Sequence, residues 1–84
     1  MKVTLKLFAS LQDYLPVEAK AKNALELELP AGTTIAQVIE RFGLPASSCK
    51  LVLVNGVFVP PAERASRILE DGETLAIWPP IAGG

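Results

Sequence analysis

The spacing of apolar residues switches from two to about 3.6 residues and back along this chain, and this switch constrains its fold more than any other sequence feature. Residues 2–9 and 24–29 alternate between apolar and polar side chains, which predicts two strands with one buried face. Residues 34–42 follow the helical period instead, with apolar side chains at Ile35, Val38, Ile39 and Phe42. The pattern therefore predicts one main helix after a pair of strands.

The residues at both ends of this segment support the helix. Thr34 and Gln37 have the spacing of a capping box, in which each side chain accepts a hydrogen bond from the other residue's backbone N–H. Gly43 can adopt the left-handed conformation that ends a helix, and Pro45 prevents its continuation.

The second half of the chain returns to strands. Residues 50–54 and 57–59 predict a hairpin, because the Asn55-Gly56 pair between them suits the positive φ angles of a tight turn. Pro60-Pro61 places the second arm at a sheet edge or ends it in a loop. Residues 74–78 predict the last strand. The element order predicts an α+β roll, a mixed sheet with one main helix across it.

The connecting segments are less regular. Residues 10–16 break the alternation and predict a short helical turn that places Leu11 and Leu15 inward, and residues 62–69 predict another. Residues 17–23 are polar and are interpreted as a loop.

Length and composition exclude several classes of protein. The chain has 84 residues, which corresponds to one small domain. Its 8 basic and 9 acidic residues give a net charge of −1, whereas proteins that bind nucleic acid carry a basic surplus. Without histidine, the chain has no Ser–His or Cys–His nucleophile pair and no zinc site of histidine and cysteine. We expect no bound metal or cofactor, and no catalysis by this chain alone.

Cys49 is the only cysteine, so no disulfide can form within the chain, which is consistent with a reducing compartment. The sequence has no apolar run near the ~20 residues of a membrane span and no signal-peptide segment, so we expect a cytoplasmic protein without a membrane partner. Cys49, next to Lys50, could relay a persulfide. We favour an inert interpretation, because a lone cysteine beside a strand is more often a small buried apolar side chain.

The last six residues, 79–84, form an extended tail that differs from the predicted domain of residues 1–78. Pro79-Pro80 fixes two φ angles and favours a path away from the sheet. Beyond the prolines, the chain ends with Ile81, Ala82, Gly83 and Gly84. A Gly-Gly end is slim enough to enter a narrow channel and bring its carboxylate into another protein's active site.

With this tail, the chain resembles the MoaD/ThiS family, and within it the small subunit of molybdopterin synthase. The resemblance rests on the Asp71-Gly72-Glu73 turn, the Leu75–Trp78 strand and the Pro-Pro-Ile-Ala-Gly-Gly ending. It extends to Leu7-Phe8-Ala9 and to the Val54-Asn55-Gly56 hairpin. The resemblance implies the ubiquitin-like β-grasp fold, which matches the predicted element order, and it implies a sulfur carrier.

In such a carrier, the resemblance implies that the carboxylate of Gly84 is the reactive group. A ubiquitin-activating-enzyme-like adenylyltransferase would use ATP and magnesium to form an acyl-adenylate there, and a persulfide donor would convert it to a thiocarboxylate. The large subunit of molybdopterin synthase would supply the catalytic side chains and pass the sulfur to cyclic pyranopterin monophosphate. The segment that threads into this partner would consist of Pro79, Pro80, Ile81, Ala82 and Gly83.

Other functions fit the same residues. Thiamine sulfur carriers also end in Gly-Gly on a similar roll, although Pro-Pro followed by Ile-Ala favours the molybdopterin branch. A ubiquitin-like protein modifier would use the same adenylate to form an isopeptide bond with a lysine. A simple interaction module would leave its tail unactivated.

We also expect the face of the sheet opposite the core to carry apolar side chains. In a β-grasp roll the first and last strands are parallel neighbours, so Phe8 and Trp78 lie opposite the core-facing residues, near the tail. Residues 51–54 are all apolar, so both faces of this strand carry apolar side chains. One alternating pair among them therefore shares the outer face. We expect Phe8 and Trp78 to contact a partner, unless a loop or the tail covers them.

Overall fold

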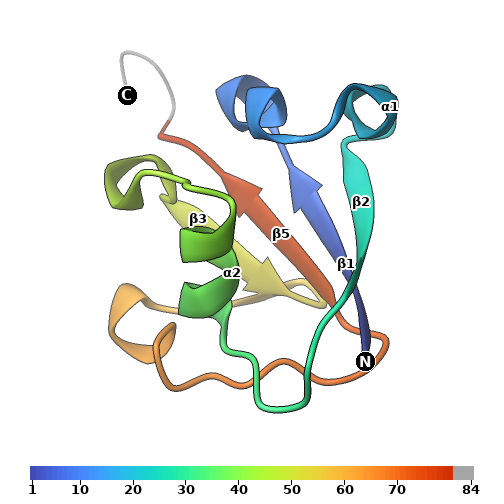
Figure 1. The fold of residues 1–84 in the computed structure, drawn as a ribbon. Helices are drawn as coiled ribbons and strands as arrows, with labels where there is room; N and C mark the ends of the chain where they lie inside the picture. The colour runs from blue at the N-terminus through green and yellow to red at the C-terminus, as the bar shows by residue number, and fades with distance from the viewer. Residues whose placement is uncertain (81–84) are drawn as a thin grey trace.

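The computed structural model describes residues 1–80, and within them five strands form one mixed sheet of order β2-β1-β5-β3-β4 (Figure 1). The strands are β1 (Lys2–Leu7), β2 (Ala24–Glu28), β3 (Leu51–Val54), β4 (Val57–Phe58) and β5 (Thr74–Trp78). β1 and β5 run parallel in the centre of the sheet, and the other neighbouring pairs are antiparallel. The expected α+β roll is therefore confirmed.

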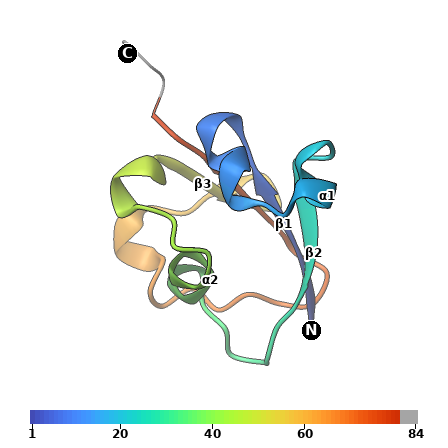
Figure 2. The ribbon, with the colours of Figure 1, turned by 45° about the horizontal axis from the view of Figure 1, so that its top comes forward.

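The helix α2 (Ile35–Arg41) lies across one face of this sheet, as Figures 1 and 2 show from two directions. Its predicted capping box is present: the backbone N–H of Thr34 donates to Oε1 of Gln37 at 2.8 Å, and that of Gln37 donates to Oγ1 of Thr34 at 3.2 Å. Gly43, with φ of 66°, follows its end. The capping residues thus place the helix where the sequence predicted it.

The core lies between α2 and the sheet. Its fully enclosed side chains come from β1, η1 (Ala9–Tyr14), α2, β3 and β5. They include Leu5, Leu7, Leu11, Ile35, Val38, Val52, Leu75 and Ile77. The turn between β3 and β4 has positive φ at Asn55 (49°) and Gly56 (83°), as the hairpin prediction requires.

The structure corrects the interpretation of residues 17–23 as a loop, because α1 (Val17–Lys20) is one turn of helix. The backbone oxygen of Pro16 accepts from the N–H groups of Ala19 and Lys20 at 2.9 and 3.2 Å, and Ala19 is buried. A single buried alanine leaves no apolar periodicity in the sequence. β1 also ends earlier than predicted, since Ala9 adopts a positive φ of 53°.

Three of the remaining connections contain a short 3-10 helix. The two that follow α2 in the chain are η2 (Ala46–Ser48) and η3 (Pro61–Glu63). The turn predicted for residues 10–16 is η1, and both Leu11 and Leu15 are buried as expected. Among the described residues, no helix has the length and apolar character that a membrane span requires.

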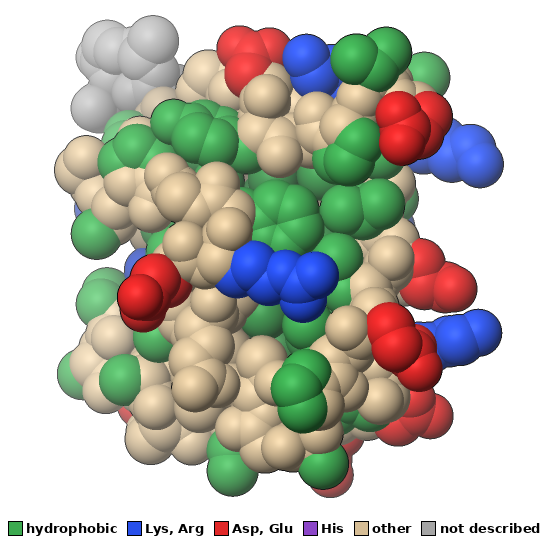
Figure 3. Space-filling model, viewed as in Figure 1, with side chains coloured by type: hydrophobic (Ala, Val, Ile, Leu, Met, Phe, Trp, Pro, Cys, Tyr) green, Lys and Arg blue, Asp and Glu red, His purple; other side chains and the backbone are tan. Residues whose placement is uncertain are grey.

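Charges of both signs lie over the face that α2 covers (Figure 3), where acidic side chains stand beside basic ones. The two charge totals of the whole chain, 8 basic and 9 acidic, are nearly equal. This face therefore carries charges of both signs side by side.

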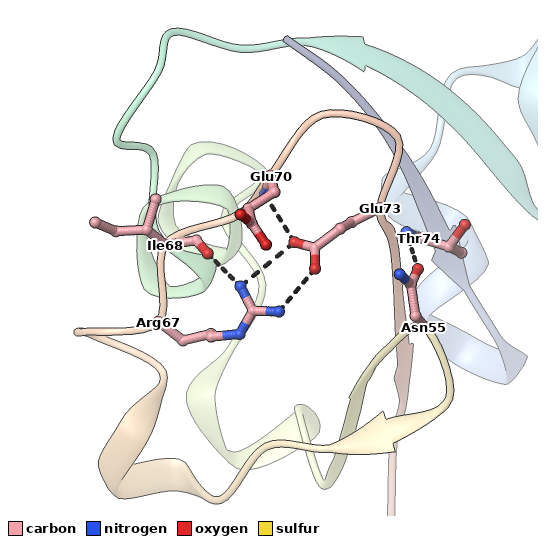
Figure 4. Close-up of polar contacts among 6 residues, drawn as sticks. All are labelled: Asn55, Arg67, Ile68, Glu70, Glu73 and Thr74. Carbon is pink, nitrogen blue, oxygen red and sulfur yellow. Dashed lines mark hydrogen bonds and ion pairs between the residues drawn. The ribbon is translucent and has the colours of Figure 1, made fainter.

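Arg67 and Glu73 join the segment after η3 to the start of β5 (Figure 4). Nη2 of Arg67 donates to Oε2 of Glu73 at 2.8 Å, and its Nη1 donates to the backbone oxygen of Ile68. The backbone N–H of Glu70 donates to Oε1 of Glu73 at 2.7 Å. Chiefly through the hydrogen bond from Arg67, these contacts hold the pKa of Glu73 below its ordinary value, although burial acts in the opposite direction.

This ion pair predicts a pH-dependent contribution to stability. We expect Glu73→Gln to lower the free energy of unfolding by about 1.5 kcal/mol at neutral pH, the size of a hydrogen bond to a charged group. Because the pKa of folded Glu73 is lowered, its contribution is complete above the unfolded pKa of about 4.3 and is lost as the pH falls through the folded pKa.

Urea unfolding at neutral and acid pH measures this effect. The difference between wild type and Glu73→Gln is expected to shrink in acid. Glu40→Gln is the control, because Glu40 is exposed on α2 and belongs to none of the ion pairs found among residues 1–80. A difference that is the same at every pH would contradict the assignment.

Candidate functional site

The candidate site begins where β5 leaves the sheet. β5 ends at Trp78, whose backbone oxygen accepts from the N–H of Lys50 at 3.0 Å. Pro79 is partly buried and Pro80 is exposed, and neither belongs to a strand. The predicted tail residues Ile81, Ala82, Gly83 and Gly84 lie outside the described residues. The site that the structure does describe is therefore the base of the tail.

Phe8 and Trp78 lie together at this base. Their rings stack with centroids 4.0 Å apart and an angle of 3° between the planes. The parallel pairing of Leu7 with Ile77 places the two aromatic residues side by side, one position further along each strand. Because Leu7 and Ile77 are fully buried, Phe8 and Trp78 point to the opposite face, as predicted, and both remain partly exposed.

The apolar face continues from this aromatic pair across β3 and β4. Leu51 pairs with Trp78, and Leu53 pairs with Phe58, so these side chains share the face. Leu51 is 40% exposed and Phe58 is 48% exposed. Val52 and Val54, two residues apart on β3, are buried. Leu51 and Leu53 are therefore the pair of β3 that faces outward. We call Phe8, Leu51, Leu53, Phe58 and Trp78 the outer apolar face.

Phe58 is a member of this face that the sequence analysis did not name. The signal was available in the hairpin, because a two-residue Asn-Gly turn pairs Val54 with Val57 and therefore Leu53 with Phe58. On its other side the face borders a basic residue, since Lys6 of β1 pairs with Ala76 of β5. The outer apolar face is thus a cross-strand surface that one end of the sheet presents beside the tail.

Cys49 lies inside the protein, 3% exposed, between η2 and β3. Its Sγ donates to the backbone oxygen of Pro45 at 3.4 Å. Burial raises the pKa of the Cys49 thiol, although the nearby charge of Arg64 acts in the opposite direction. A buried thiol with a raised pKa has little thiolate character, which supports the inert interpretation of Cys49.

The mixed sheet, the helix across it and the parallel pairing of the first and last strands define a ubiquitin-like β-grasp protein. The model of the ThiS family matches residues 5–84, and the chain therefore belongs to the ThiS family. This match extends over the Gly-Gly end. The chain is thus a ThiS/MoaD-like sulfur carrier or a ubiquitin-like protein.

Solved structures share this fold at low sequence identity. The HVO 2177 protein of Haloferax volcanii has a TM-score of 0.74 and 23% identity, and the match covers 100% of this chain and 87% of that chain. A Pyrococcus furiosus protein, provisionally assigned as molybdopterin converting factor subunit 1, has a TM-score of 0.66 and 23% identity over 95% and 98% of the two chains.

A third structure is a complex of subunits 1 and 2 of the molybdopterin-converting factor from Helicobacter pylori. One of its chains matches with a TM-score of 0.60 and 13% identity over 100% of both chains. No match was found among curated proteins. At these identities, the three structures establish the fold.

Proposed function

We propose that this chain is the sulfur-carrying small subunit of a molybdopterin synthase, with the thiocarboxylate formed at Gly84. The observation that carries the proposal is the outer apolar face, whose stacked Phe8 and Trp78 lie at the base of a tail that ends in Gly-Gly. Such a surface lets a partner hold the domain while the tail reaches that partner's active site.

The chemistry needs a leaving group, because a free carboxylate is a poor electrophile. An adenylyltransferase joins the Gly84 carboxylate to AMP from ATP, with magnesium, and releases pyrophosphate. The outer sulfur of a persulfide donor then attacks the carbonyl carbon and AMP leaves. A thiol cleaves the resulting S–S bond, which leaves a thiocarboxylate on the chain and a disulfide between the thiol and the donor.

The domain's role in this scheme is to dock and to present the tail. The large subunit of the synthase binds the outer apolar face and supplies the catalytic side chains, since this chain has no histidine. Pro79-Pro80 stiffens the exit from β5, so less conformational entropy is lost when the tail enters a channel. In favour of this pairing, a complex of subunits 1 and 2 exists for the Helicobacter pylori protein of the same fold.

A thiamine sulfur carrier is the second candidate, and membership in the ThiS family favours it. The activation chemistry at Gly84 is the same, and only the acceptor enzyme differs. A ubiquitin-like modifier would differ at the last step, because a lysine amine would displace AMP and form an isopeptide bond.

Incubation of the chain with an activating enzyme, ATP, magnesium and a persulfide donor separates these functions. We expect the intact mass to increase by the exchange of one oxygen for sulfur. Addition of the synthase large subunit and the pyranopterin is then expected to restore the original mass and yield a dithiolene product. Sulfur loading followed by transfer only to a thiazole-forming enzyme would support the thiamine branch, and slower-migrating conjugates would support a protein modifier.

A further inference from the structure

A cavity of about 710 Å³ opens at the β3–β4 edge of the sheet, between α2, η2 and η3. This volume lies in the range of small-molecule sites. Most of its wall is apolar and is formed by Ala36, Ile39, Cys49, Leu51, Phe58 and Pro61. The activation chemistry at Gly84 assigns no role to this cavity, although two of its lining residues, Leu51 and Phe58, also belong to the outer apolar face.

Arg64 also lines the cavity, and its position is fixed from three sides. It is only 8% exposed. Its Nε donates to the backbone oxygen of Val59 at 3.2 Å, and its Nη1 donates to that of Cys49 at 2.8 Å. The backbone oxygen of Arg64 accepts from the N–H of Ala36, on α2, at 3.0 Å. The guanidinium is therefore held by the backbone oxygens of Val59 and Cys49, and the bond from α2 fixes the backbone of Arg64.

The third nitrogen of this guanidinium has no partner. Among residues 1–80, Nη2 of Arg64 is buried without a hydrogen bond, and no carboxylate lies within ion-pair distance of the group. The other charged residue of the wall is Lys50, also a cation. Buried charged groups are normally paired, because an unpaired one loses its hydration without compensation. An apolar cavity with an unsatisfied cation is complementary to an apolar anion.

We propose that this cavity binds a small monocarboxylate with an apolar body. Its carboxylate accepts a hydrogen bond from Nη2 of Arg64, since a guanidinium is the side chain best suited to a carboxylate. Its apolar body packs between Ile39 and Phe58. Lys50 is an exposed residue of the cavity wall, so its side chain can turn aside to admit the carboxylate without disturbing the core.

Titration of the full ¹⁵N-labelled chain with hexanoate tests this site by NMR. We expect saturable shifts at the backbone amides of Cys49 and Lys50 and at Nε–H of Arg64. Hexanol lacks the charge and acetate lacks the apolar body, so each is expected to bind about tenfold more weakly than hexanoate. Equal affinities for hexanoate and either analogue would overturn the proposal.

Two variants test the residues. Arg64→Gln is expected to weaken hexanoate binding about tenfold, whereas Arg41→Gln, with the same charge change on α2 outside the cavity, leaves it unchanged. Ala36→Leu fills the cavity and keeps the guanidinium, and is expected to weaken binding in the same way. If Arg64→Gln does not fold, the affinity of Ala36→Leu for hexanoate tests the proposal on its own.

Retained affinity in folded Arg64→Gln, or in Ala36→Leu, would show that hexanoate binds elsewhere. Neither measurement uses the tail or the activating enzyme. Failure of this site would therefore leave the proposed sulfur carriage untouched, and failure of sulfur loading would leave this site untouched.

Discussion

Deletion of Gly84 is expected to abolish formation of the thiocarboxylate, because the carboxylate presented to the activating enzyme then belongs to Gly83. An extended residue spans about 3.4 Å, so the reacting carbon would stop that far short of the α-phosphate of ATP. A displacement of about 1 Å can reduce a rate about 100-fold. The full loss of one residue is expected to leave no detectable loading by intact-mass analysis.

Two changes in the same region sharpen this expectation. One alanine appended after Gly84 keeps a free carboxylate but moves it too far along the channel, and it is expected to block loading equally well. Gly83→Val keeps the length of the tail and adds a branched side chain, which is expected to slow loading about 100-fold through misplacement of the carboxylate.

Cys49→Ser is the matched control for these variants. It removes the only side-chain thiol of the chain, and a serine hydroxyl at this buried position can still donate to the backbone oxygen of Pro45. Loading of Cys49→Ser is expected to equal that of wild type. Loss of loading in Cys49→Ser, with loading retained after deletion of Gly84, would move the sulfur from the carboxylate to the thiol.

Local signals in the sequence were enough to predict most of the fold. The apolar period of β1, the capping box of Thr34 and Gln37, and the Asn55-Gly56 turn each depend on residues close together in the chain. Such features are determined by backbone sterics and by neighbouring hydrogen bonds, so one sequence displays them. The aromatic pair Phe8 and Trp78 followed from parity once the first and last strands were taken as parallel neighbours.

The features that escaped prediction depend on tertiary packing. α1 was missed because Ala19 is its only buried residue, so the amphipathic pattern is absent. The outward pair of β3 was undecided between Leu51–Leu53 and Val52–Val54, since only the pairing with β5 distinguishes them. The sequence analysis places Arg64 within the short helical turn predicted for residues 62–69. Nothing near it in sequence indicates that the backbone oxygens of Cys49 and Val59 hold its guanidinium.

Trp78→Asp is expected to weaken binding to the synthase large subunit about 100-fold, the effect of losing a central aromatic anchor of an interface. The substitution removes the stack with Phe8 and places a carboxylate on the outer apolar face. Calorimetric titration of the two subunits measures the effect. Val17→Asp is the control, because Val17 is 81% exposed on α1, which contacts β2 at the opposite edge of the sheet.

The stacked geometry also predicts how single and double alanine variants compare in the same titration. Because the rings of Phe8 and Trp78 support each other, truncation of either to alanine also frees the other to move. The losses of binding free energy in Phe8→Ala and Trp78→Ala are therefore expected to sum to more than the loss in the double variant. Additive losses would mean that each ring contacts the partner independently. An unchanged dissociation constant for folded Trp78→Asp would place the docking surface away from the base of the tail.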